Sequence, residues 1–80
     1  MKDFVAYIVK NLVDDPDDVR INEIGGTNTR ILELIAPQKD IGKIIGKQGR
    51  TINALRTLLS SVAARTGSRI SLEVIEERTD

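Results

Sequence analysis

The first apolar pattern in the chain has the spacing of an amphipathic helix. Its apolar side chains recur at i, i+4 and i+8 and so share one face: Phe4, Val5, Ile8, Val9 and Leu12. The residue before a proline is disfavoured in helical geometry, so Asp15-Pro16 ends this segment. We expect a helix over about residues 3–14.

Two strand-like segments follow. In DVRINEI, Val19 and Ile21 share one side of the chain while Arg20 and Asn22 take the other, which is the alternation of a strand. The segment GGTN, residues 25–28, has the composition of a hairpin turn. TRILELIA then forms a second, aliphatic strand that ends at Pro37.

The second half of the chain indicates two helices and a strand. Asp40 is a candidate N-cap for a short helix over 41–45. From Arg50 onward apolar residues keep a helical stripe for about four turns, namely Ile52, Leu55, Leu59, Val62 and Ala63, and Gly67 stands where a left-handed residue ends a helix. RISLEVIE has the alternation of a final strand, with Ile70, Leu72 and Val74 on one face.

The order α-β-β-α-α-β predicts an α+β fold, a three-stranded sheet with three helices packed on one face. A chain of 80 residues has room for one domain, so we assign residues 1–80 to it. The core of that domain spans 28–76, and residues 77–80 form a polar tail.

Composition removes several classes of function. The chain contains no Cys and no His, which excludes disulfides and thiol chemistry and removes the usual general base and commonest metal ligand. The acidic run DDPDD lacks the glycine-turned loop of a cation site. We therefore expect no catalytic residues, no metal and no cofactor. Charges among the apolar residues of the N-terminus exclude a signal peptide or membrane span, and we expect a cytoplasmic protein.

The charges are unevenly distributed although the net charge is zero. Residues 1–40 carry five basic and eight acidic side chains, whereas residues 41–80 carry seven basic and four acidic ones. Between Ile41 and Leu72 there are six basic residues and no acid. Local potential steers an anionic ligand more than the total charge does, so the second half of the chain favours an anionic partner.

The segment IIGKQGRTI, residues 44–52, interrupts the helical pattern with two glycines. Gly46 and Gly49 permit a tight bend between two helices, which would leave Lys47 and Arg50 near the positive N-terminal end of the second helix. Acidic residues would be more stable there, so the basic pair indicates a phosphate site. A simple solvated turn is the alternative. A P-loop is disfavoured because the glycines are one residue too close and Gln48 replaces the magnesium-binding hydroxyl.

This motif resembles the signature of the K-homology (KH) domain. An aliphatic pair (Ile44, Ile45), Gly-x-x-Gly with a basic residue (46–49) and an aliphatic residue three positions later (Ile52) all match that signature. The element order is similar to the type II arrangement, and the size resembles the small bacterial single-KH RNA-binding proteins.

The resemblance implies that the chain binds single-stranded RNA, with Gly46, Lys47, Gln48 and Gly49 gripping phosphates beside Lys43 and Arg50. The bases would lie against Ile44, Ile45 and Ile52. It also implies a role as an RNA chaperone or post-transcriptional regulator in cell elongation and wall growth, as a homodimer or as a heterodimer with a larger Jag-family KH protein. A protein assembly module in which RNA is secondary is the alternative, and an enzyme is disfavoured. The sequence does not decide whether Arg30, Arg56, Arg65 and Arg69 face the RNA.

Overall fold

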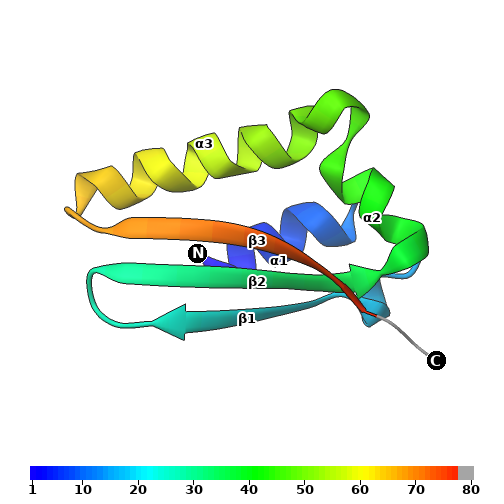
Figure 1. The fold of residues 1–80 in the computed structure, drawn as a ribbon, viewed down its shortest axis with the longest axis horizontal. Helices are drawn as coiled ribbons and strands as arrows, with labels where there is room; N and C mark the ends of the chain where they lie inside the picture. The colour runs from blue at the N-terminus through cyan, green and yellow to red at the C-terminus, as the bar shows by residue number, and fades with distance from the viewer. Residues whose placement is uncertain (78–80) are drawn as a thin grey trace.

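The computed structural model describes residues 1–77 and has the predicted α+β architecture (Figure 1). The helices are α1 (Lys2–Lys10), α2 (Gln38–Ile45) and α3 (Arg50–Arg65), and the strands are β1 (Arg20–Gly25), β2 (Thr29–Pro37) and β3 (Arg69–Glu77). Short 3₁₀ turns, at Pro16–Asp18 and Lys47–Gly49, precede β1 and α3. None of the helices within residues 1–77 is long and apolar enough to span a bilayer.

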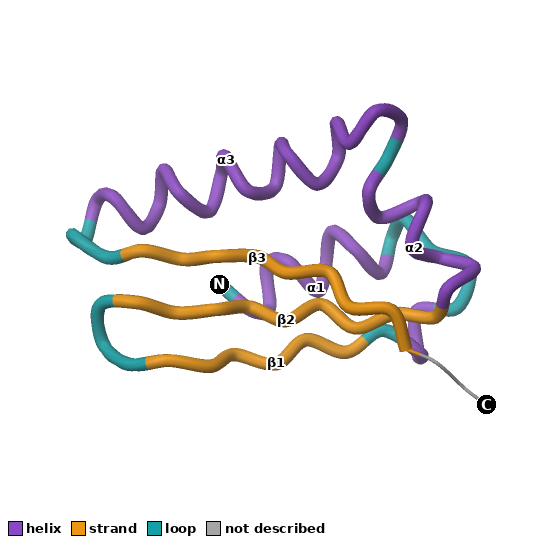
Figure 2. Tube along the Cα trace, in the orientation of Figure 1, coloured by secondary structure: helices purple, strands orange, loops and turns teal. Residues whose placement is uncertain are grey.

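The three strands form one mixed sheet in the order β1-β2-β3. β1 pairs antiparallel with β2, with Ile21 opposite Leu34, and β2 pairs parallel with β3, with Leu32 opposite Leu72. The helices gather on one side of the sheet, where α3 runs alongside β3 (Figures 1 and 2). The α2–α3 bend and the β1–β2 hairpin therefore lie at opposite ends of the molecule.

The core forms between the buried face of β2 and the apolar faces of the helices. Leu32, Leu34 and Ala36 are buried on the helix side of β2, and the remaining core comes from every other helix and strand: Val5, Val9, Val19, Ile21, Ile44, Ile52, Leu55, Leu59 and Leu72. The predicted faces of β1 and β3 are confirmed, since Val19 and Ile21 are buried and the helix-side residues of β3 pack on the core.

The end of α3 is also as predicted. Gly67 follows the helix with φ +69°, and the N–H of Ser68 donates to the carbonyl of Ala63 at 2.9 Å. This hydrogen bond reaches back five residues and satisfies a carbonyl at the helix end.

α1 and β3 differ in length from the prediction. α1 ends at Lys10 rather than near residue 14, because the Asn11 side chain donates to the carbonyl of Tyr7 at 2.7 Å and the chain turns there. β3 continues through Glu77 because its pairing with Pro37 of β2 extends the ladder. The remainder of the predicted polar tail, residues 78–80, lies outside the described residues.

The prediction for Asp40 was wrong. α2 begins at Gln38 directly after the extended Pro37, so Asp40 lies inside the first turn and is not the N-cap. Its side chain is fully buried. Pro37 sets this boundary, because its φ of −62° and ψ of 150° end the strand and the next residue enters the helix at once.

Candidate functional site

The bend between α2 and α3 is built from three residues with left-handed backbone. Gly46 has φ +78° and ψ 171°, Gln48 has φ +58° and ψ 25°, and Gly49 has φ +73° and ψ 14°. The N–H of Gly49 donates to the carbonyl of Gly46 at 3.1 Å, which closes the turn. The predicted tight helix–loop–helix bend is therefore present, with α3 starting at Arg50.

Gly46 is required at this bend for two reasons. Its φ lies in a region that side-chain-bearing residues rarely adopt. A Cβ at this position would also lie 2.3 Å from Oγ1 and 3.0 Å from the backbone nitrogen of Thr51, in the first turn of α3. The absence of a side chain thus lets the two helices approach each other closely.

The side chains around the bend leave a basic, open surface. Lys47, Gln48 and Arg50 are exposed, and Nη2 of Arg50 donates to Oε1 of Gln48 at 3.3 Å. The first turn of α3 contains no acidic residue, so its free N–H groups and partial positive charge are not neutralised locally. This surface favours the binding of an anion. The lack of an acidic residue in the first turn makes the helix itself less stable.

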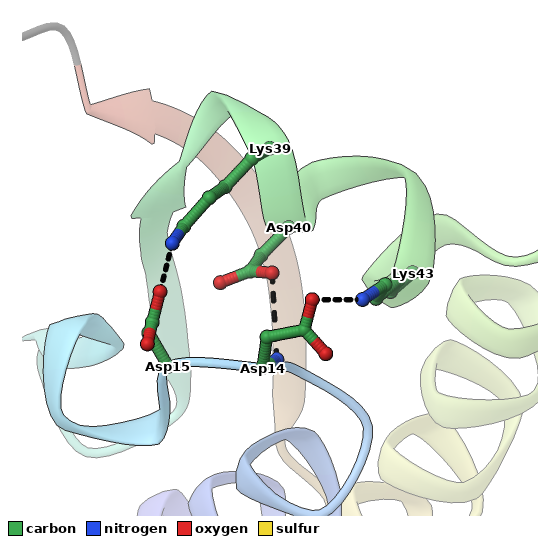
Figure 3. A network of polar contacts seen from close by, with 5 residues as sticks. All are labelled: Asp14, Asp15, Lys39, Asp40 and Lys43. Carbon is green, nitrogen blue, oxygen red and sulfur yellow. Dashed lines mark hydrogen bonds and ion pairs between the residues drawn. The ribbon is translucent and has the colours of Figure 1, made fainter.

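Lys43 is engaged differently from the other predicted phosphate contacts. It lies in the last turn of α2, and its ammonium forms an ion pair with Asp14 (Figure 3). The hydrogen bond from Lys43, followed by its Coulomb attraction, lowers the pKa of the Asp14 carboxyl. Both side chains are exposed to solvent, 45% for Lys43 and 70% for Asp14, so the pair contributes little stability. A phosphate that contacts Lys43 therefore competes with this carboxylate for the ammonium.

Asp40 contacts the segment that carries Asp14. The carboxylate of Asp40 is buried beneath this segment, and its Oδ1 lies 3.5 Å from the backbone N–H of Asp14 (Figure 3). The second ion pair of this cluster joins Lys39 to Asp15. Two lysines of α2 are therefore paired with the loop after α1, and within residues 1–77 no group of acidic side chains is arranged to hold a metal ion.

The three predicted aliphatic contacts occupy different environments. Ile44 is fully buried and Ile52 is 5% exposed, and both belong to the core. Ile45 is half-buried at the end of α2. Ile44 and Ile52 therefore hold the bend against the sheet, and Ile45 is the member of the set with surface left for a ligand.

The structure shows the contacts of two of the four arginines that the sequence left open. Arg30 pairs with Glu23 at 3.3 Å on the helix side of the sheet. Arg56 reaches from α3 to β3, where its Nε and Nη2 donate to the carbonyl oxygen of Leu72 at 3.2 and 3.1 Å. Helical spacing partly indicates this position of Arg56. The residue follows buried Leu55 and lies four positions after buried Ile52, so it borders the apolar face of α3.

Comparison with known proteins shows similarity over almost the whole chain, including this bend. Residues 2–74 match the family described as KhpA/KhpB, KH domain. The RNA-binding protein KhpA of Chlamydia pneumoniae is 63% identical over 78 residues, covering 98% of this chain and 100% of that protein. The RNA-binding proteins KhpA of Borreliella burgdorferi and Clostridium perfringens are 47% identical over 74 residues (92% of this chain and 90% of that protein) and 44% identical over 75 residues (94% and 100%). No solved structure matches.

Proposed function

The chain belongs to the KhpA/KhpB family of KH domains, and on that premise we propose that it binds single-stranded RNA through the Gly46–Gly49 bend. The names of its relatives support RNA binding as the activity. The observation that supports the bend as the RNA contact is the combination of left-handed backbone, exposed Lys47 and Gln48, and an acid-free helix start.

The mechanism we propose is binding without catalysis. The bend brings the sugar–phosphate backbone close to the chain because Gly46 and Gly49 have no side chains, and Lys47 and Arg50 neutralise its charge. Lys43 joins when a phosphate displaces Asp14. Ile45 supplies apolar surface to a base, while Ile44 and Ile52 support the bend from the core. A single module neutralises few phosphates, so the affinity is modest and falls as salt rises.

The test replaces both residues between the glycines. Lys47→Asp combined with Gln48→Asp is expected to weaken binding of a short single-stranded RNA by about tenfold to a hundredfold, because two carboxylates face the phosphates. Both positions are exposed, so the fold is retained. Fluorescence anisotropy with labelled RNA measures the affinity, and circular dichroism checks the fold.

The matched control is Lys2→Asp combined with Thr27→Asp. It changes the net charge by the same amount, at exposed positions of α1 and of the hairpin, away from the bend (Figure 1). Its affinity is expected to remain within about threefold of the parent, because a distant charge acts only through the screened field. Equal losses in the two double variants would show that net charge, and not the bend, holds the RNA.

In the cell, we propose that this binding serves RNA chaperoning or post-transcriptional control in the cytoplasm. The partner implied by the family resemblance is a larger Jag-family KH protein, in processes linked to cell elongation and wall growth.

Assembly with a protein partner is a second candidate function, favoured by apolar side chains exposed on two neighbouring helices. Leu58 and Val62 of α3 are 49% and 44% exposed, and Phe4 of α1 is 42% exposed. Met1 and Val62 line one hollow, which shows that the start of α1 adjoins the end of α3. Large apolar side chains that gather on one exposed face are typical of an interface.

For the homodimer, Leu58→Glu is expected to convert a dimer into a monomer in multi-angle light scattering at high micromolar concentration, because the carboxylate would be buried without a partner. A parent protein that is already monomeric under these conditions would exclude the homodimer.

A further inference from the structure

One face of the sheet is left uncovered by the helices of residues 1–77, which gather on the other side (Figures 1 and 2). Successive side chains of a strand point to opposite faces, and paired residues share a face. The register of the strands therefore identifies the side chains of the uncovered face, which we call the open face. They are Arg20, Asn22 and Ile24 of β1, Ile31, Glu33 and Ile35 of β2, and Ser71, Glu73 and Ile75 of β3.

Two apolar rows cross the open face. In one row Ile24 lies opposite Ile31, and in the other Ile35 lies opposite Ile75. None of the four isoleucines belongs to the core that residues 1–77 form on the helix side. Ile24 is 49% exposed, and the other three are half-buried. Apolar side chains gathered in this way on an exposed face are typical of an interaction surface.

The row between these isoleucines is acidic. Glu33 and Glu73 are Cα partners in the parallel pairing of β2 with β3, so their carboxylates project from adjacent positions of the same face. Like charges directly opposite each other destabilise a sheet. None of the ion pairs found in residues 1–77 involves either carboxylate. A cationic side chain placed between the two carboxylates would remove their repulsion.

This charge distribution decides which kind of partner fits the open face. Carboxylates in the middle of the face repel the phosphates of RNA and of lipid headgroups. A second copy of the chain, related by a two-fold axis through the middle row, would bring its own Glu33 and Glu73 against the first pair. The face is therefore complementary to a different protein, one that carries a cationic side chain between two apolar ones.

We propose that the open face binds an amphipathic helix of a partner protein, in which a Lys or Arg is flanked by apolar residues four positions before and after it. Adjacent rows of the face are two residues apart along each strand, which is about 7 Å. Four residues of a helix rise about 6 Å. A helix laid along the strands therefore places one apolar side chain on each isoleucine row and its cation between Glu33 and Glu73.

The fold already contains a helix packed in this direction, since α3 runs alongside β3 on the other side of the sheet (Figure 1). The open face is separate from the bend and from the exposed apolar side chains of α1 and α3. The inference goes beyond the proposed function and does not depend on RNA binding.

The experiment uses two synthetic helical peptides that differ at one residue. Each is a sixteen-residue helix of alanine and glutamine, with isoleucine four positions before and four positions after a central residue, which is arginine in one peptide and glutamate in the other. Each peptide is titrated into the intact chain labelled with ¹⁵N, and the backbone amide shifts are followed by NMR.

We expect the arginine peptide to bind with a Kd of about 0.1–1 mM, and the glutamate peptide to bind about tenfold more weakly because its carboxylate meets two others. The largest amide shifts are expected in β1, β2 and β3. The affinity for single-stranded RNA is expected to change by less than about threefold when the peptide is bound, because the two surfaces are separate.

Variants of the two glutamates test the role of their charge. Glu33→Lys combined with Glu73→Lys is expected to prefer the glutamate peptide by about tenfold. Glu33→Gln combined with Glu73→Gln is expected to bind both peptides within about twofold of each other, and it provides the same decision if the charge-reversed variant unfolds. The matched control is Asp3→Lys combined with Asp17→Lys, which makes the same change in charge at exposed positions outside the strands and keeps the preference for arginine.

An arginine peptide that does not bind would overturn the proposal, and so would a preference for arginine that survives in the variants of Glu33 and Glu73. Amide shifts confined to α3 or to the bend would place the peptide on another surface and reject the proposal as well. Shifts of the open face that appear with RNA, or with rising protein concentration, in place of the peptide would assign the face to RNA or to a second copy. The proposed RNA binding is tested separately at Lys47 and Gln48, so either proposal can fail while the other stands.

Discussion

Gly46→Ala is expected to destabilise the fold by about 3 kcal/mol and to weaken RNA binding as the bend distorts. The backbone at Gly46, with φ +78° and ψ 171°, costs a residue with a side chain about 1–3 kcal/mol. The new methyl group would also approach the backbone nitrogen of Thr51 to 3.0 Å. The Thr51 hydroxyl can rotate away, but its nitrogen cannot move without displacing α3. Urea unfolding followed by circular dichroism measures the loss.

Gly42→Ala is the control for this change. Gly42 lies in α2, and a Cβ there meets nothing within 4 Å. Alanine has the higher helix propensity, so this variant is expected to be more stable than the parent by about 0.5–1 kcal/mol. The same chemical change, four residues apart, thus has opposite signs. Gly46→Ala with the stability of the parent would contradict the geometry of the bend described above.

Ile44→Ala is expected to remove about 2–5 kcal/mol of stability, because Ile44 is fully buried in the core. A domain of 80 residues has roughly 4–12 kcal/mol in total. The variant should therefore lose a large part of its stability, with a shift of the urea midpoint. At temperatures where it remains folded, it is expected to bind RNA as the parent does, since its side chain has no surface to offer.

The adjacent Ile45→Ala provides the comparison. Ile45 is half-buried, so its truncation is expected to cost about 1 kcal/mol of stability and to weaken RNA binding about fivefold through lost apolar contact with a base. Comparison of the two variants distinguishes a side chain that stabilises the fold from one that contacts the RNA. A variant at Ile45 that binds RNA normally would remove this residue from the proposed interface.

The elements that periodicity predicts well are those whose side chains meet a continuous core. β2 is the clearest example, because Leu32 and Leu34 alternate with half-buried residues and align with the stripe of α3. The boundaries followed local features that the pattern does not contain. The hydrogen bond of Asn11 to Tyr7 ends α1, and the inward direction of Asp40 depends on a loop 26 residues earlier in the chain.

The sequence predicts those parts of the site that depend on residues close together in the chain. The bend follows from Gly46 and Gly49, whose spacing and flanking isoleucines are visible in the sequence. The pairing of Lys43 with Asp14 joins residues 29 positions apart, and only folding brings them together. Arg56 was left undecided because its acceptor is a backbone carbonyl of β3, a group that every residue carries and that no pattern of side chains distinguishes.

The parallel pairing of β2 with β3 has a consequence for protein synthesis. The ladder runs from Thr29 opposite Arg69 to Pro37 opposite Glu77, so it joins segments separated by α2, the bend and α3. A nascent chain that lacks β3 leaves one edge of β2 unpaired and part of the core open. The residues of the bend are translated earlier, but their support is incomplete until β3 emerges from the ribosome. Completion of the core around the bend therefore depends on the synthesis of β3.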